Sequence, residues 1–126
     1  MTTCLSLLIR SPRAGYVHGQ AVTTTHAVAS VPANWRGRRV IFAAVTANIW
    51  INFGTANTVE VDRTAVSTNA GTPTFALTAV ATAGTPIHAG TAIDFIIDPD
   101  STFFAFEGDA SGYLYMWLAD VASPNS

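Results

Sequence analysis

Short stretches in which apolar and polar residues alternate recur along this chain, and they constrain its fold more than any other feature. No segment repeats its apolar residues with the 3.6-residue period of an amphipathic helix. Side chains of a β-strand point alternately to opposite faces of a sheet, so the alternation predicts strands. In the stretch NIWINFG, for example, Ile49 and Ile51 fall on one face and Trp50 falls on the other.

Clusters of Gly, Pro, Asn and Asp separate these stretches, and such residues favour turns. Short strands at intervals of about 8–12 residues are typical of an all-β sandwich or barrel. We therefore predict one domain over residues 1–126, an all-β fold that is a single antiparallel β-sandwich, jelly-roll-like, with about eight strands. The predicted strands are residues 22–28, 38–46, 48–53, 58–62, 74–82, 92–97, 102–107 and 113–119.

The first 19 residues have two interpretations. Pro12 and Gly15 interrupt any long regular element, and the segment holds arginines but no acidic residue. It is therefore either an extended contact arm that adds a strand to a neighbour's sheet or the first strand of the chain's own sandwich. In the arm interpretation, the contact residues are Leu5, Leu7, Ile9, Arg10 and Arg13.

Charged residues make up only 11% of the 126 residues, against about 25% in a typical soluble domain. A small protein with so few charges is poorly protected against self-association, so neighbours are expected to cover much of its surface as a homo-oligomer. The alternative is that many arginines and alanines without any lysine reflect GC-rich coding. We expect no membrane span, because the longest apolar run, residues 40–45, is far shorter than the roughly 20 residues required. We also expect no signal peptide, and the lone Cys4 excludes an intrachain disulfide.

The charges that are present are divided unevenly along the chain. Before position 40 there are five arginines and no acid, and from Glu60 onward there are eight acids and one arginine, Arg63. Strands of the two parts could pair these charges within one chain, or the charges could mediate contact between subunits or with a partner surface. Nucleic-acid binding is the least favoured interpretation, because WRGRR is a single short basic spot. The candidate contact arginines of this basic part are Arg10, Arg13, Arg36, Arg38 and Arg39.

Six of the eight acidic residues lie between positions 94 and 120, which raises the question of a metal or catalytic site. The predicted strands place Asp98 and Asp100 in one turn and Asp109 in the next, where aspartates cap their own backbone. The alternative is a calcium site that combines these three residues with Glu107, although no EF-hand spacing is present. Histidine spacings typical of metal sites and nucleophile motifs are also missing. We expect no enzymatic activity, no metal and no cofactor.

Both faces of the last predicted strand are apolar. By parity, Tyr113, Tyr115 and Trp117 share one face, and the alternate positions 114, 116 and 118 share the other. One face supplies the core, so the other must meet a partner subunit, a second layer or a ligand such as a sugar. We therefore add the three aromatic residues to the candidate partner contacts.

Three stretches, NIWINFGTANTV, PIHAGTAIDFII and SGYLYMWLAD, carry a resemblance to small all-β accessory proteins of tailed-bacteriophage virions. The similarity covers about residues 31–120 and consists of strand and turn patterns. It implies a structural virion protein assembled in the host cytoplasm, most specifically a capsid decoration (cement) protein that binds and stabilises the assembled head. The implied partners are the major capsid protein or other virion proteins, with a trimer as the favoured homo-oligomer. The alternative is a tail- or fibre-associated adhesion module or another carbohydrate-binding β-sandwich.

Overall fold

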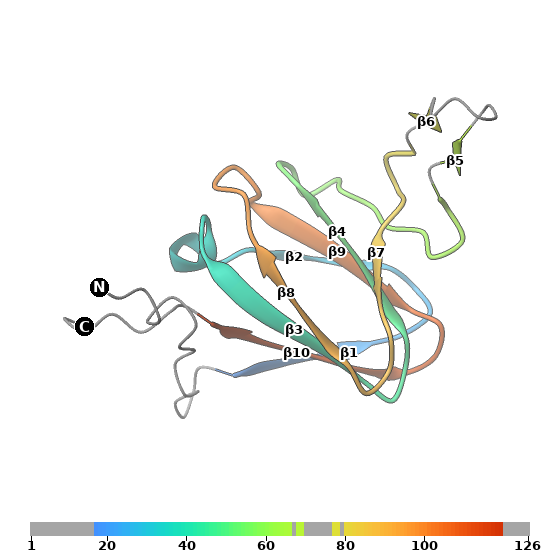
Figure 1. Ribbon diagram of the computed structural model, residues 1–126, viewed down its shortest axis with the longest axis horizontal. Coiled ribbons are helices and arrows are strands. Elements are labelled where there is room, and N and C mark those ends of the chain that lie inside the picture. The colour runs from blue at the N-terminus through green and yellow to red at the C-terminus, as the bar shows by residue number, and fades with distance from the viewer. Residues whose placement is uncertain (1–16, 67, 70–76, 79, 120–126) are drawn as a thin grey trace, which may run out of the picture.

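Two four-stranded antiparallel sheets pack face to face in the computed structural model, which describes residues 17–66, 68–69, 77–78 and 80–119 (Figure 1). The first sheet has the order β1 (His18–Val22), β10 (Gly112–Leu118), β3 (Arg39–Val45), β8 (Ala92–Ile96). The second sheet has the order β2 (Ala27–Ser30), β9 (Phe103–Gly108), β4 (Ile49–Gly54), β7 (Thr85–Ile87). The remaining elements are the 3₁₀ helix η2 (Ala33–Trp35) and the short strands β5 (Thr68–Asn69) and β6 (Leu77–Thr78).

Neighbouring strands come from opposite ends of the chain. The first sandwich strand, β1, pairs with the last, β10, and β2 pairs with β9. The chain passes from one sheet to the other between most successive strands, so its two halves fold back on each other. This connectivity is that of a jelly roll. The predicted eight-stranded antiparallel β-sandwich is therefore confirmed.

The core lies between the sheets and is built from alternate residues of the strands. On β3, Val40 and Phe42 are fully buried, and Leu114 of the neighbouring β10 is buried opposite Ala44. Phe42 contacts three further phenylalanine rings edge-on, at centroid distances of 5.4–6.2 Å. Edge-to-face contacts are a favoured arrangement of aromatic rings. The period-two pattern of the sequence thus selects the residues that fill the sandwich.

The prediction of one strand over residues 22–28 is wrong. β1 ends at Val22, and the next strand, β2, begins only at Ala27 in the other sheet. The intervening bend is stabilised by the hydroxyl of Thr23, which accepts a hydrogen bond from the backbone N–H of Thr25 at 3.2 Å. Threonine favours strands, but its hydroxyl also caps a local turn, and here the turn prevails.

The predicted strand 58–62 is also wrong, and the predicted strand 74–82 is wrong over residues 80–82, while its residues 74–76 and 79 lie outside the described residues. The first is a loop whose only bridge among the described residues joins Asp62 to Ala83. Of the second, β6 occupies two residues, and a turn closed by the N–H of Ala83 on the carbonyl of Val80 follows. β7 was missed because its Pro86 and flanking glycines indicated a turn, yet β7 lies at a sheet edge, where proline is tolerated.

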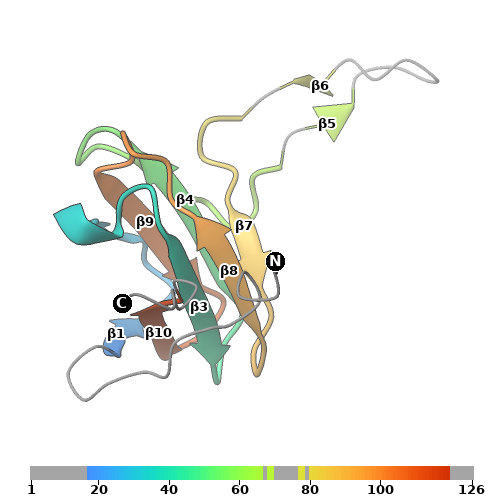
Figure 2. The same cartoon turned by 60° about the vertical axis from the view of Figure 1, so that its left-hand side comes forward.

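Residues 55–84, which connect β4 to β7, are called the β4–β7 insert below. Its strands β5 and β6 stand away from the sandwich in both views (Figure 2). Nearer the sandwich, the insert lies against the second sheet, because Asn52 of β4 donates hydrogen bonds to the carbonyls of Glu60 (2.9 Å) and Ala81 (2.8 Å). Val61 of the insert is buried there. Residues 58–62 alternate like a strand, yet they form a loop that the side chain of Asn52 and the burial of Val61 hold against the sheet.

At the N-terminal end, β1 starts at His18 and pairs with β10. The last two residues of the predicted arm, His18 and Gly19, therefore belong to the sandwich. Residues 1–16, with Leu5, Leu7, Ile9, Arg10 and Arg13, lie outside the described residues. In the described part of the chain, no helix has the length and apolar character needed to cross a membrane.

Candidate functional site

The side of the first sheet that faces away from the core is here called the outer face. Its residues alternate with core residues along each strand and line up across the sheet, with Tyr113 opposite Val45 and Trp117 opposite Ile41. The large apolar residues of the outer face are Ile41, Val45, Ile96, Tyr113, Tyr115 and Trp117. The predicted parity of β10 is confirmed, because its alternate residues Leu114 and Met116 are buried in the core.

Several of these apolar side chains are exposed. The exposed fraction is 75% for Ile96, 50% for Tyr113 and 39% for Val45. Scattered apolar residues are normal on protein surfaces, but a contiguous apolar face on a sheet indicates a binding surface. The outer face is therefore the strongest candidate interface of the described chain.

The outer face carries little net charge. Its two charged residues, Arg39 and Asp94, form an ion pair between β3 and β8. This pair joins an arginine of the basic first part to an acid of the second part, as the intrachain interpretation of the charge asymmetry predicted. A partner of the outer face thus meets an apolar sheet whose opposite charges already neutralise each other.

Two tyrosines of the outer face form an aromatic platform. The rings of Tyr113 and Tyr115 are stacked, with centroids 6.2 Å apart and planes inclined by 23°. The ring of Tyr115 extends over Gly19 of the neighbouring strand, where a Cβ atom would lie 3.0 Å from its Cε1 atom. The small residue at position 19 therefore lets the ring lie flat against the sheet.

The other arginines near η2 are not part of the outer face. The guanidinium of Arg36 donates to the carbonyl of Val31 at 3.1 Å, and that of Arg38 donates to the carbonyl of Asn34 at 3.3 Å. Both contacts hold the connection between β2 and β3. Of the three arginines predicted here as partner contacts, the structure places only Arg39 together with the aromatic residues.

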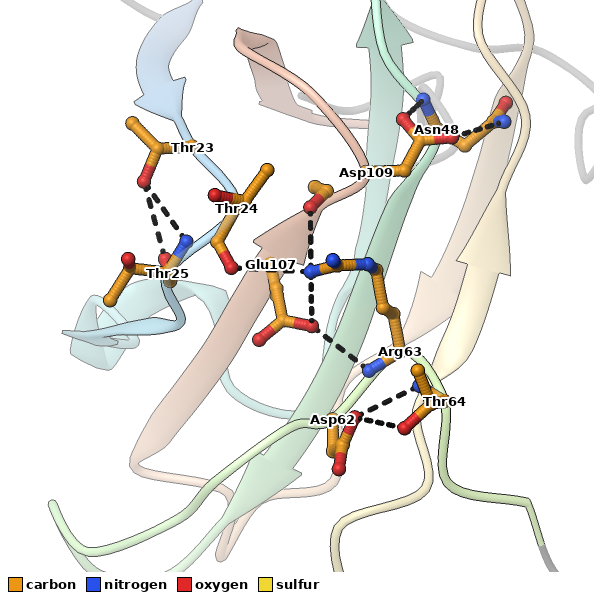
Figure 3. A network of polar contacts seen from close by, with 10 residues as sticks. Thr23, Thr24, Thr25, Asn48, Asp62, Arg63, Thr64, Glu107 and Asp109 are labelled. Carbon is orange, nitrogen blue, oxygen red and sulfur yellow. Dashed lines mark hydrogen bonds and ion pairs between the residues drawn. The ribbon is translucent and has the colours of Figure 1, made fainter.

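A polar cluster around Glu107 holds the β4–β7 insert on the opposite side of the sandwich (Figure 3). Glu107 is only 8% exposed, and its Oε2 atom accepts hydrogen bonds from the backbone N–H (3.0 Å) and from Nη1 (3.1 Å) of Arg63. Nη1 also donates to the carbonyls of Thr24 at 3.2 Å and Gly108 at 3.3 Å. One arginine thereby joins the β1–β2 bend, the insert and the end of β9. Sequence reasoning missed this cluster and also Asn52.

The predicted alternative of a calcium site is wrong. Asp98 and Asp100 precede β9, whereas Glu107 and Asp109 lie at its far end, about 16 Å away at the rise of a strand. Asp109 instead accepts hydrogen bonds from the backbone N–H (3.1 Å) and the side-chain amide (2.9 Å) of Asn48. Within the described ranges, no three metal-ligating side chains converge on one point.

A hollow of about 440 Å³ lies between the insert and β9, with His26, Asp62, Arg63 and Glu107 in its lining. Hydrogen bonds from the N–H and hydroxyl of Thr64 to the carboxylate lower the pKa of Asp62 below its ordinary value of 3.8. The carboxylates of Asp62 and Glu107 are thus both engaged in holding the loop. Their arrangement explains how the insert is anchored.

Comparison of the chain with protein-family models, curated proteins and solved structures gives no match. Any proposal about function therefore rests on the sequence and the structure of this chain alone.

Proposed function

We propose that this chain is a non-catalytic assembly protein that binds another protein through the outer face of its first sheet. The observation that carries this proposal is the apolar outer face, which has residues from three strands: Tyr113 and Val45 lie opposite each other and are exposed at one end, and Ile96 is exposed at the other. Four strands about 4.8 Å apart, with a rise of about 3.3 Å per residue, give this face an area of about 400 Å². Burial of such a surface favours association, at roughly 25 cal/mol for each Å² of apolar area removed from water.

The specific form of the proposal is a capsid decoration protein whose partner is the major capsid protein or another virion protein. It is supported by the resemblance to virion accessory proteins and by the low charge of the chain, which suits a surface covered by neighbours. A protein that binds only the assembled shell stabilises it by mass action, by about 2.7 kcal/mol per site when its free concentration is 100 times Kd. No catalytic group is required for this function.

The test measures the protein on purified virus particles and then asks which face holds it. We expect quantitative mass spectrometry to find many copies per particle, and particles stripped of the protein to bind it again from solution. Tyr113→Lys should abolish rebinding, because it replaces the exposed ring of the apolar face with a charge. Asn57→Lys, which adds the same charge at an exposed position of the insert, should rebind normally. Absence of the chain from particles, or equal binding by both variants, contradicts the proposal.

The stacked tyrosines support a second candidate, a carbohydrate-binding module. A platform of two nearly parallel rings can stack on a sugar, and the charged side chains of Arg39 and Asp94 on the same face are partly exposed, as hydroxyl partners must be. A glycan array distinguishes the candidates. Sugar binding should be lost in Tyr113→Ala and retained in Ile96→Ala, whereas protein docking over the whole face should be weakened by both changes.

A further inference from the structure

The four edge strands of the sandwich differ in how they are protected against pairing with another chain. Natural proteins blunt sheet edges by short strands, proline or charged side chains. β7 has three residues and contains Pro86, and β2 has only four residues. β8 carries Asp94, which is paired with Arg39. Three of the four edges therefore carry a protective feature.

β1 carries none of these features. Its five residues, HGQAV, include no proline and no Asp, Glu, Lys or Arg. One side of β1 pairs with β10 over its whole length, and the other side has no strand partner among the described residues. The backbone groups on that side form a template for a further strand.

We infer that the edge of β1 without a strand partner among the described residues pairs antiparallel with β1 of a second copy of this chain, which joins the two first sheets into one sheet of eight strands. Pairing centred on Gln20 places Gly19 opposite Ala21 of the other copy and His18 opposite Val22. Gly19 and Ala21 are small and exposed, so the backbones can approach closely. No carboxylate, lysine or arginine faces a like charge across the new pair, so the strand is complementary to itself.

The pairing also brings the two outer faces together. A two-fold axis normal to the sheet relates antiparallel strands, so both outer faces lie on the same side of the joined sheet. The flat area of one outer face is about 400 Å², so pairing of β1 gives the two copies a joint platform of about 800 Å² for a further partner. It also predicts a dimer in place of the trimer that the resemblance implies.

Two matched lysine variants test the inference. Ala21 on β1 and Ala92 on β8 are both exposed, and both lie on the outer face at opposite edges of the same sheet. We expect Ala21→Lys to weaken dimerisation by about tenfold or more in analytical ultracentrifugation, because lysine on an edge strand opposes pairing. Ala92→Lys adds the same charge away from the β1 edge and should dimerise like the unmodified protein. A packing of two outer faces against each other would instead be weakened by both variants.

Hydrogen exchange on the unmodified protein gives a second readout that requires no variant. Backbone amides of β1 should become more protected as the protein concentration rises, while those of β8 should not change. A monomer at high concentration, a trimer, or equal effects of the two lysines would overturn the inference. Loss of the dimer on deletion of residues 2–13 would also overturn it and would assign the edge to the N-terminal segment. Self-association is measured without any particle, so its outcome is separate from that of the proposed virion function.

Discussion

Replacement of Arg63 by alanine should destabilise the protein more than any other change to a charged residue in the described chain. The Nη1 atom of Arg63 donates to Glu107 and to two backbone carbonyls, at distances of 3.1–3.3 Å. In Arg63→Ala the carboxylate of Glu107 stays buried, and of these contacts it keeps only the hydrogen bond from the backbone N–H of residue 63. The β4–β7 insert then loses the side chain that joins it to β9.

The magnitude follows from the burial of the two partners. Breaking a fully buried ion pair by removing one partner costs about 3–5 kcal/mol. The side chain of Glu107 is 11% exposed, but that of Arg63 is 33% exposed, so the lower end applies. We expect a loss of about 3 kcal/mol in the free energy of unfolding, which corresponds to a fall in Tm of about 10 °C for a domain of this size. Glu107→Gln keeps an acceptor at this position and should cost about 1–2 kcal/mol.

The assay is urea unfolding followed by circular dichroism, arranged as a double-mutant cycle of Arg63→Ala and Glu107→Gln. Arg39→Ala is the matched control, because Arg39 pairs with Asp94 at the surface, where both side chains are 32% or more exposed. That control should cost about 0.2–1 kcal/mol. A cost of Arg63→Ala no larger than that of Arg39→Ala, or the absence of coupling between Arg63 and Glu107 in the cycle, would contradict a stabilising role of this buried pair.

Three further changes test other parts of the structure. Asp62→Asn should be less stable than the unmodified protein near neutral pH, and the difference should vanish as acid unfolding curves pass below the lowered pKa of Asp62. The sign follows because a carboxylate whose pKa is lower in the folded state stabilises it only while ionised. Gly84→Ala should cost about 1–3 kcal/mol in urea unfolding. Its Cβ atom would lie 2.5 Å from the side chain of Val61 and 2.9 Å from the carbonyl of Ile51. Thermal unfolding curves with and without EDTA should coincide, and a large fall in Tm with EDTA would restore the calcium interpretation.

The sequence predicts those strands whose alternation is bounded by turns on both sides. β3 and β4 follow from the Ala47-Asn48 turn between them, and β8, β9 and β10 follow from the turns around Pro99 and Asp109. These patterns lie within each segment, so they predict its structure without information from residues distant in sequence. The loop over residues 58–62 alternates in the same way, yet the side chain of Asn52 on the preceding strand binds one of its carbonyls and the loop forms no ladder. The residues of the loop alone therefore do not predict this hydrogen bond.

The candidate sites show the same division between local and distant information. The aromatic face of β10 follows from parity alone, because neighbouring residues on a strand must point to opposite sides. The Arg63–Glu107 pair joins residues 44 positions apart, and it forms only because the insert returns across the second sheet. Six acids in one stretch left a metal site open as the alternative to turn residues, but β9 separates Asp98 and Asp100 from Glu107 and Asp109. Charge density along a sequence is therefore a weak guide to charge density in space.

Parity leaves open which apolar face of β10 enters the core, and the chemistry of the side chains decides it. A tyrosine hydroxyl in the core would lie among phenylalanine and aliphatic side chains without a hydrogen-bond partner, which costs free energy. Leu114 and Met116 have no such group, and their register places them beside Ala44 and Phe42 of β3, where they fill the space between the sheets. Tyr113 therefore faces outward because its hydroxyl needs water or a partner. The same requirement that gives the sandwich its core leaves the aromatic face of β10 on the surface, where a partner can bind it.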